Sequence, residues 1–230
     1  MEKISSENYD FYFLKNSIAE RDINQIIEIQ ENCFKEICTF LDIHPSIRIK
    51  YYLVDSPERV GEIYGDYEPC NGFACPPDEV YAVYNEKIKC IGPHEDTHIL
   101  SFTINKPKSS FIREGLAMFF DKVWWDKDND DWVRLFLKEK RYVNIEQLLS
   151  EENFIKYSDS LTYPIAGSFT KFILGNYGVE KYIYLYNTFL VRTKRLCSGK
   201  SSWTLEPIGS VAIDMGAGSY MEWIDGVDRW

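Results

Sequence analysis

Apolar residues recur along the chain at two spacings, which predict helices and strands in different segments. A helical spacing over residues 23–41 predicts a long helix, and Asp22 can cap its start. Its apolar positions are Ile26, Ile27, Phe34, Ile37 and Leu41. Residues 46–54 are β-branched and aromatic and predict a strand, and residues 80–85, "VYAVYN", predict a shorter one. A Gly- and Pro-rich loop, residues 65–79, precedes the second strand.

The second half of the chain is patterned as helices. Pro93 and Pro164 can each stand in a first helical turn, where the missing N–H has no partner in any case, and Gly178 can end a helix. The predicted helices cover residues 93–104, 112–125, 130–141, 144–154, 163–178 and 179–195. Residues 196–230 are rich in Gly and Ser and show no pattern.

These elements predict an α+β fold in a single domain, residues 1–230. We expect a small mixed sheet packed on the helix that begins at Pro93, followed by a mainly helical lobe. The core of this domain is expected at about 70–190, with an N-terminal helix and strand at 15–60 and a tail of unclear structure at 196–230.

Charge excludes two classes of partner. The formal net charge is −10, whereas nucleic acids and anionic membrane surfaces attract basic patches. No stretch approaches the roughly 18 apolar residues of a membrane span. We therefore expect neither nucleic acid nor membrane as a partner.

The N-terminus and the cysteines suggest a cytoplasmic protein. The start, "MEKISSENYDFYF", lacks the basic and apolar regions of a secretory signal. The six cysteines are Cys33, Cys38, Cys70, Cys75, Cys90 and Cys197, with no C-x-x-C pair. We expect mostly buried thiols rather than disulfides. If the N-terminus has been trimmed, a secreted protein remains an alternative.

The strongest chemical signal is "HEDTH" at residues 94–98, which holds two of the three histidines in the chain. Residues four apart on a helix lie on one face, so His94 and His98 can bind one ion, and zinc accepts neutral imidazole. Glu95 lies about 100° round the helix, where a base acting on water belongs. The alternative is two surface histidines on an acidic helix. Asp96 and Thr97 fill the variable positions, and we assign them no role.

Glu114 is the candidate third ligand. Fifteen residues separate it from His98, and it lies in the first turn of the next predicted helix. A solvated glutamate is also favoured there by the helix dipole. The sequence after Glu114 is apolar, "GLAMFF", so a carboxylate without a partner would be costly there. This favours the ligand hypothesis.

Three motifs together resemble a known family. H-E-x-x-H is followed by "EGLA" at 114–117 and by "YPIAGSFTKFILGNYG" at 163–178. In this order they resemble the gluzincin zinc metallopeptidases, the thermolysin-like group, and most closely their small bacterial "peptidase MA-like" members. The resemblance covers about residues 70–190.

The resemblance implies a zincin-like fold and a set of site residues. It makes His94, His98 and Glu114 the ligands of one Zn²⁺ per chain, and Glu95 the catalytic base. Members of the group often place a Tyr or His near the carbonyl oxygen, which makes Tyr163 a candidate for stabilising the oxyanion. The alternative is that Tyr163 is simply one of sixteen tyrosines.

The chain departs from the thermolysin pattern at two points. The spacing between His98 and Glu114 is shorter, which requires a tight turn between the two helices. Met118 stands where thermolysin has an Asp, four residues after the glutamate ligand. Asp121 could orient a ligand instead, or could be an ordinary surface aspartate.

Three further features leave alternatives open. The 80–85 strand could be a sheet edge that grips an extended peptide, as in gluzincins, or a core strand. Cys90, four residues before His94, could join a Cys₁His₂ site, although a buried thiol fits the Glu114 motif better. His44, in a loop before Pro45, is expected to be structural or solvated.

We therefore expect a zinc metallopeptidase, a hydrolase acting on a peptide or protein substrate. One alternative is a non-catalytic, peptidase-like module that binds peptide or protein, with a structural or vestigial metal site. Another is a protease dedicated to a single cellular protein. The sequence sets neither the substrate, nor endo- or exopeptidase action, nor the oligomeric state.

Overall fold

The computed structural model describes residues 1–188 and has a mixed α+β fold, which confirms the predicted class. The chain divides into two compact units, Met1–Ile104 and Asn105–Trp230, of which the second is described as far as residue 188. The single-domain assignment and its 70–190 core stay predictions. The predicted tail, 196–230, lies outside the described residues, as does the end of the helix predicted at 179–195.

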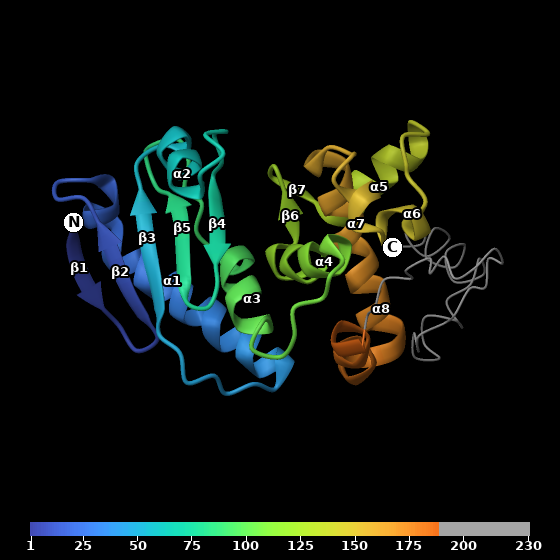
Figure 1. The fold of residues 1–230 in the computed structure, drawn as a ribbon, viewed down its shortest axis with the longest axis horizontal. Coiled ribbons are helices and arrows are strands. Elements are labelled where there is room, and N and C mark those ends of the chain that lie inside the picture. Colours follow the sequence, from blue (N-terminus) through green and yellow to red (C-terminus); the bar gives the residue numbers. More distant parts are fainter. Residues whose placement is uncertain (189–230) are drawn as a thin grey trace, which may run out of the picture. The chain divides into compact units, whose positions relative to one another are not determined.

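The first unit is built on a five-stranded sheet with the order β1-β2-β3-β5-β4 (Figure 1). The two outer pairs, β1–β2 and β4–β5, are antiparallel, whereas β2–β3 and β3–β5 are parallel, so the sheet is mixed as predicted. The strands are β1 (Glu2–Ser5), β2 (Tyr9–Phe13), β3 (Ile49–Val54), β4 (Gly72–Cys75) and β5 (Glu79–Val83). The sequence analysis missed β1 and β2, although buried and partly exposed residues alternate along β2.

The edge-strand hypothesis for residues 80–85 is wrong. β5 pairs with β3 on one side and with β4 on the other, so it is a core strand. Val80 and Ala82 are fully buried on it. The strand at this edge of the sheet is β4, which lies in the segment predicted as a loop, and β1 forms the other edge.

Two helices of the first unit cover opposite faces of the sheet. α1 (Ile18–Leu41) packs on the face that carries Tyr9, whose ring centroid lies 5.9 Å from that of Phe34. α2 (Pro57–Tyr64) packs on the other face, where Val60 joins a small buried cluster. The sequence analysis did not predict α2.

The predicted start of α1 was wrong. Ser17 caps the helix, and its hydroxyl accepts a hydrogen bond from the Glu20 backbone N–H at 3.2 Å. Asp22 lies inside the helix and binds Arg21, Lys89 and Tyr84 with its carboxylate. The apolar repeat located the helix but not its cap, because a short polar residue stands at both positions.

The second unit is mainly helical. Its helices are α4 (Ser110–Asp121), α5 (Asn129–Lys138), α6 (Ile145–Leu148), α7 (Glu151–Phe154) and α8 (Asp159–Thr188). α8 packs along α4 and α5 and bends at Gly178, whose φ of 82° breaks the helix where the sequence predicted an end. α8 begins before Pro164, however, so the predicted start at 163 was wrong.

A hairpin replaces the predicted last turn of the 112–125 helix. Strands β6 (Val123–Trp124) and β7 (Lys127–Asp128) are antiparallel, and the two turn residues between them both have positive φ. α4 itself ends at Asp121.

The structure bears on two expectations from the sequence, the state of the cysteines and the absence of a membrane-spanning segment. The five cysteines within residues 1–188 are thiols, as expected, but Cys75 is exposed and the other four are half-buried rather than buried. Cys197 lies outside the described residues. None of the helices in residues 1–188 combines the length and the apolar character that a membrane crossing requires.

Candidate metal centre

The helix α3 (Pro93–Ser101) carries the "HEDTH" motif and begins abruptly. Gly92, its N-cap, has φ 136° and ψ −164°, a conformation that residues with a Cβ rarely adopt. Pro93 follows in the first turn, where its lack of an N–H costs nothing. This turn fixes the point at which the chain enters the helix just before His94.

His94 and His98 lie one helical turn apart, with ring centroids 5.1 Å from each other. His94 is half-buried, and His98 is buried at 7% exposure, with its ring 5.7 Å from that of Phe102. The predicted helix therefore places both imidazoles on one face.

Glu114 lies in the second turn of α4, and a carboxylate fixes the start of that helix. Glu151 accepts hydrogen bonds from the Ser110 backbone N–H and from its hydroxyl, both at 2.7 Å. Arg113 donates to the Ser110 hydroxyl at 2.6 Å and to the Pro107 carbonyl at 2.6 Å. A negative charge near a helix N-terminus also interacts favourably with the helix dipole. Hydrogen bonds with both Glu151 and Arg113 therefore stabilise the first turn of α4.

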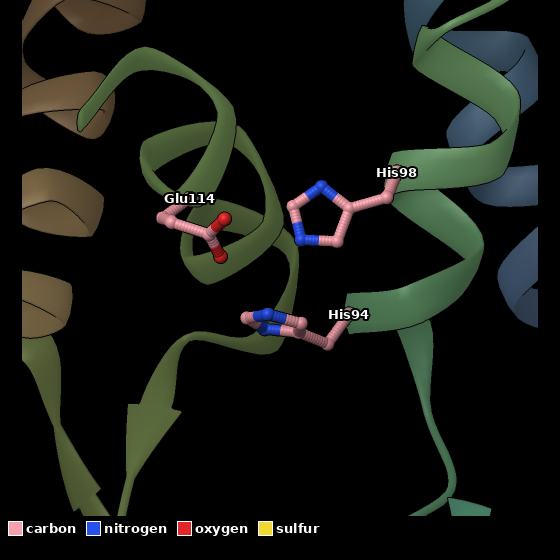
Figure 2. A group of neighbouring side chains, drawn as sticks. All are labelled: His94, His98 and Glu114. Atoms are coloured by element: carbon pink, nitrogen blue, oxygen red, sulfur yellow. The ribbon is translucent and has the colours of Figure 1, made fainter. Parts of the chain in front are cut away.

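His94, His98 and Glu114 form a group in which one ligand atom of each lies within 4.8 Å of the others (Figure 2). Two imidazoles and a carboxylate are a donor set typical of catalytic zinc. Ligand atoms of a tetrahedral zinc ion lie about 3.4 Å apart. The ligand atoms of the group are therefore at most about 1.4 Å farther apart than those of such an ion. The three residues could hold a metal ion.

Cys90 is not part of this group. Its sulfur lies instead beside Gly72 of the edge strand, 3.2 Å from the point that a Cβ on that glycine would occupy. Glu95 Oε1 lies 3.5 Å from the same point. The backbone of β4 at Gly72 therefore lies next to the candidate base Glu95.

Asp96 is fully buried, although the sequence analysis gave it no role. Its Oδ2 lies 2.5 Å from the Tyr9 hydroxyl and accepts a hydrogen bond from Gln30 Nε2 at 2.8 Å. Burial raises the pKa of Asp96 well above its usual value, and the negative charge of Glu95 adds to the shift. Burial, followed by the charge of Asp96, also raises the pKa of Tyr9. Asp96 is thus part of a buried polar network.

Met118 explains the departure from the thermolysin pattern. Its side chain is fully buried, and a Cβ placed on Gly167 of α8 would lie 2.8 Å from the Met118 Cβ. Its carbonyl accepts a hydrogen bond from Asn129 Nδ2 at 2.9 Å. An aspartate at this position would place a carboxylate in the packed contact between α4 and α8.

Tyr163 lies in an aromatic cluster of the second unit. Its ring centroid is 5.1 Å from that of Trp124 and 6.2 Å from that of Phe154. The side chain is half-buried in the early part of α8 rather than at a helix start. Its catalytic role stays a prediction.

Asp121 and His44 complete the outcome for the predicted residues, and Asp159 is a further acidic residue, which interacts with Glu114. Asp121 is the half-buried last residue of α4, and its orienting role stays a prediction. His44 is exposed in the loop before β3, as a solvated histidine would be. The sequence analysis did not consider Asp159, whose pKa is raised by burial and by the charge of Glu114.

Sequence comparison adds no family to this description: no family model matches the chain, and no curated protein matches it. The candidate site therefore rests on its own residues.

Proposed function

We propose that the chain is a zinc-dependent peptidase that hydrolyses peptide bonds. The observation that supports this most is the grouping of His94, His98 and Glu114, with ligand atoms within 4.8 Å of one another. Zinc, when bound to such residues, is a Lewis acid that makes hydroxide available near neutral pH.

The chain supplies its own proton-transfer group. Glu95 follows directly after the first histidine on α3, so its carboxylate accepts a proton from the attacking water and returns it to the leaving amine. Tyr163 is the proposed donor to the oxyanion that forms on the substrate.

The edge strand offers a place for the substrate backbone. β4 pairs on one side with β5, and Gly72 on it adjoins Glu95. An extended peptide can bind such an edge through main-chain hydrogen bonds, whatever its side chains are. A peptide or protein is therefore the proposed substrate class.

The test is Glu95→Gln, measured with a pool of unrelated peptides analysed by mass spectrometry. The variant should retain zinc and lose cleavage by at least about 100-fold. Glu28→Gln, at an exposed position of α1, is the matched control and should cleave as the wild type does. Cleavage that persists in Glu95→Gln, or that a chelator does not stop, would refute the proposed function. A wild type that holds zinc and cleaves no peptide of the pool would favour a binding module.

A further inference from the structure

Gln30 is a fully buried polar residue on the apolar face of α1. Ile26 and Phe34, one turn before and one turn after it, are both buried. A buried amide is costly unless hydrogen bonds satisfy it, so an apolar residue would be the simpler choice for this position. The hydrogen-bond partners of Gln30 therefore indicate its role.

The Gln30 amide binds both the entry and the second turn of α3. Its Oε1 accepts from the Gly92 backbone N–H at 2.8 Å, and its Nε2 donates to the Gly92 carbonyl at 3.1 Å. The same Nε2 donates to Asp96 Oδ2 at 2.8 Å. Gly92, the N-cap of α3, has no side-chain capping bond of its own. The side chain of Gln30 thus binds both backbone groups of the N-cap residue.

Tyr9 joins the same network from the sheet. Its hydroxyl lies 2.9 Å from the backbone carbonyl oxygen of Gln30 and 2.5 Å from Asp96 Oδ2. Tyr9 is on β2 and is fully buried. One carboxylate oxygen of Asp96 is therefore held by a strand and a helix together.

The two anchored residues fix α3 in two ways. Gly92 and Asp96 are four residues apart, about one turn or about 6 Å along the axis, so tying both to one side chain fixes the axial position of the helix. Asp96 also lies about 160° round the helix from His94 and from His98. Holding this face inward therefore turns both imidazoles to the opposite face.

We propose that Gln30 and Asp96, with Tyr9, are positioning residues of the metal centre, because they set the rotation of the helix that presents His94, Glu95 and His98. This inference rests on the proposed function, since it requires that the two histidines bind zinc. The inference gives Asp96, a variable position of the motif, a role that the spacing of the two histidines does not indicate.

The test is the zinc dissociation constant of the full chain, measured by competition with a chromophoric chelator. Gln30→Met keeps the volume of the side chain and removes its hydrogen bonds with α3, so zinc binding should weaken by about 10- to 100-fold. Tyr9→Phe removes only a hydroxyl and should weaken it by at least about 3-fold. Tyr9→Phe also keeps the test valid if Gln30→Met fails to fold.

Ile37→Val and Ile37→Ala are the controls for lost stability. Ile37 is fully buried on α1, about two turns beyond Gln30. At an equal loss of melting temperature, the Ile37 variants should bind zinc within about 2-fold of the wild type, because the ligands keep their orientation.

The outcomes separate the two proposals. Tight zinc binding by the wild type, with equal losses in the Gln30 and Ile37 variants or no loss in the Gln30 and Tyr9 variants, would overturn the positioning role alone. A wild type that binds no zinc would overturn the positioning role and the proposed function together.

Discussion

Gly115 adjoins the candidate ligand Glu114 and lies where α4 packs against α8. A Cβ at this position would lie 2.5 Å from Thr170 Oγ1 and 2.9 Å from the Ala166 carbonyl oxygen. The threonine side chain can rotate, but the carbonyl belongs to the backbone of α8. Gly115→Ala must therefore move one helix relative to the other.

The magnitude follows from two opposing effects. Alanine is favoured over glycine within a helix by about 1 kcal/mol, whereas overpacking a core costs about 1–3 kcal/mol. Gly175 provides a matched comparison on α8, because a Cβ there meets nothing within 4 Å. The helix preference is common to both variants, so Gly115→Ala should be less stable than Gly175→Ala by about 1–3 kcal/mol.

Urea unfolding followed by tryptophan fluorescence measures this difference. Every tryptophan of the chain lies after residue 104, so the signal reports on the second unit alone. With a slope of about 2 kcal/mol per M, the two midpoints should differ by about 0.5–1.5 M. Equal midpoints for the two variants would refute the close packing of α4 on α8.

Three further predictions concern caps, charge and packing. Ser17→Ala removes the oxygen that accepts from the Glu20 backbone N–H, so it should lower the unfolding free energy of the first unit by about 1 kcal/mol, measured by circular dichroism in urea. Hydrogen bonds, the largest contribution coming from Arg21, lower the pKa of Asp22. The ionised carboxylate therefore stabilises the folded state above the unfolded pKa of about 3.9, and this stabilisation is lost as the pH falls. Asp22→Asn should therefore flatten the fall of the urea midpoint between about pH 5 and about pH 2; an unchanged slope would contradict this. Met118→Asp should lower the unfolding free energy by about 3 kcal/mol or more, because the carboxylate would be buried against α8. An unchanged unfolding free energy in that variant would contradict the assigned packing.

The sequence predicted those parts of the fold that depend on local pattern. The "HEDTH" helix and the helix that carries Glu114 were found because their spacing and flanking prolines are local signals. β4 was missed because its glycine and the prolines on both sides of it are typical of a loop, and its strand conformation depends on pairing with β5. Whether a strand is an edge or a core strand also depends on pairing partners far away in the chain.

The hairpin after α4 was beyond reach for a different reason. Its turn residues, Trp125 and Asp126, have φ of 48° and 59°, whereas such turns usually contain glycine or asparagine. The apolar residues of segment 112–125 therefore predicted a helix that continues as far as this turn.

The network around Asp96 left one local signal in the sequence. Gln30 occupies a position between Ile26 and Phe34 where the helical repeat predicts an apolar residue. A polar residue at such a position indicates a buried partner. The identity of that partner, on a helix more than sixty residues away, required the structure.

The central claim, that His94, His98 and Glu114 hold one metal ion, is tested most directly by elemental analysis of the purified chain beside His98→Ala and Glu114→Ala. The account predicts about one zinc per wild-type chain and its loss from both variants. No zinc in the wild type after incubation with zinc would contradict the account, and zinc kept by Glu114→Ala would show that this glutamate is not a ligand.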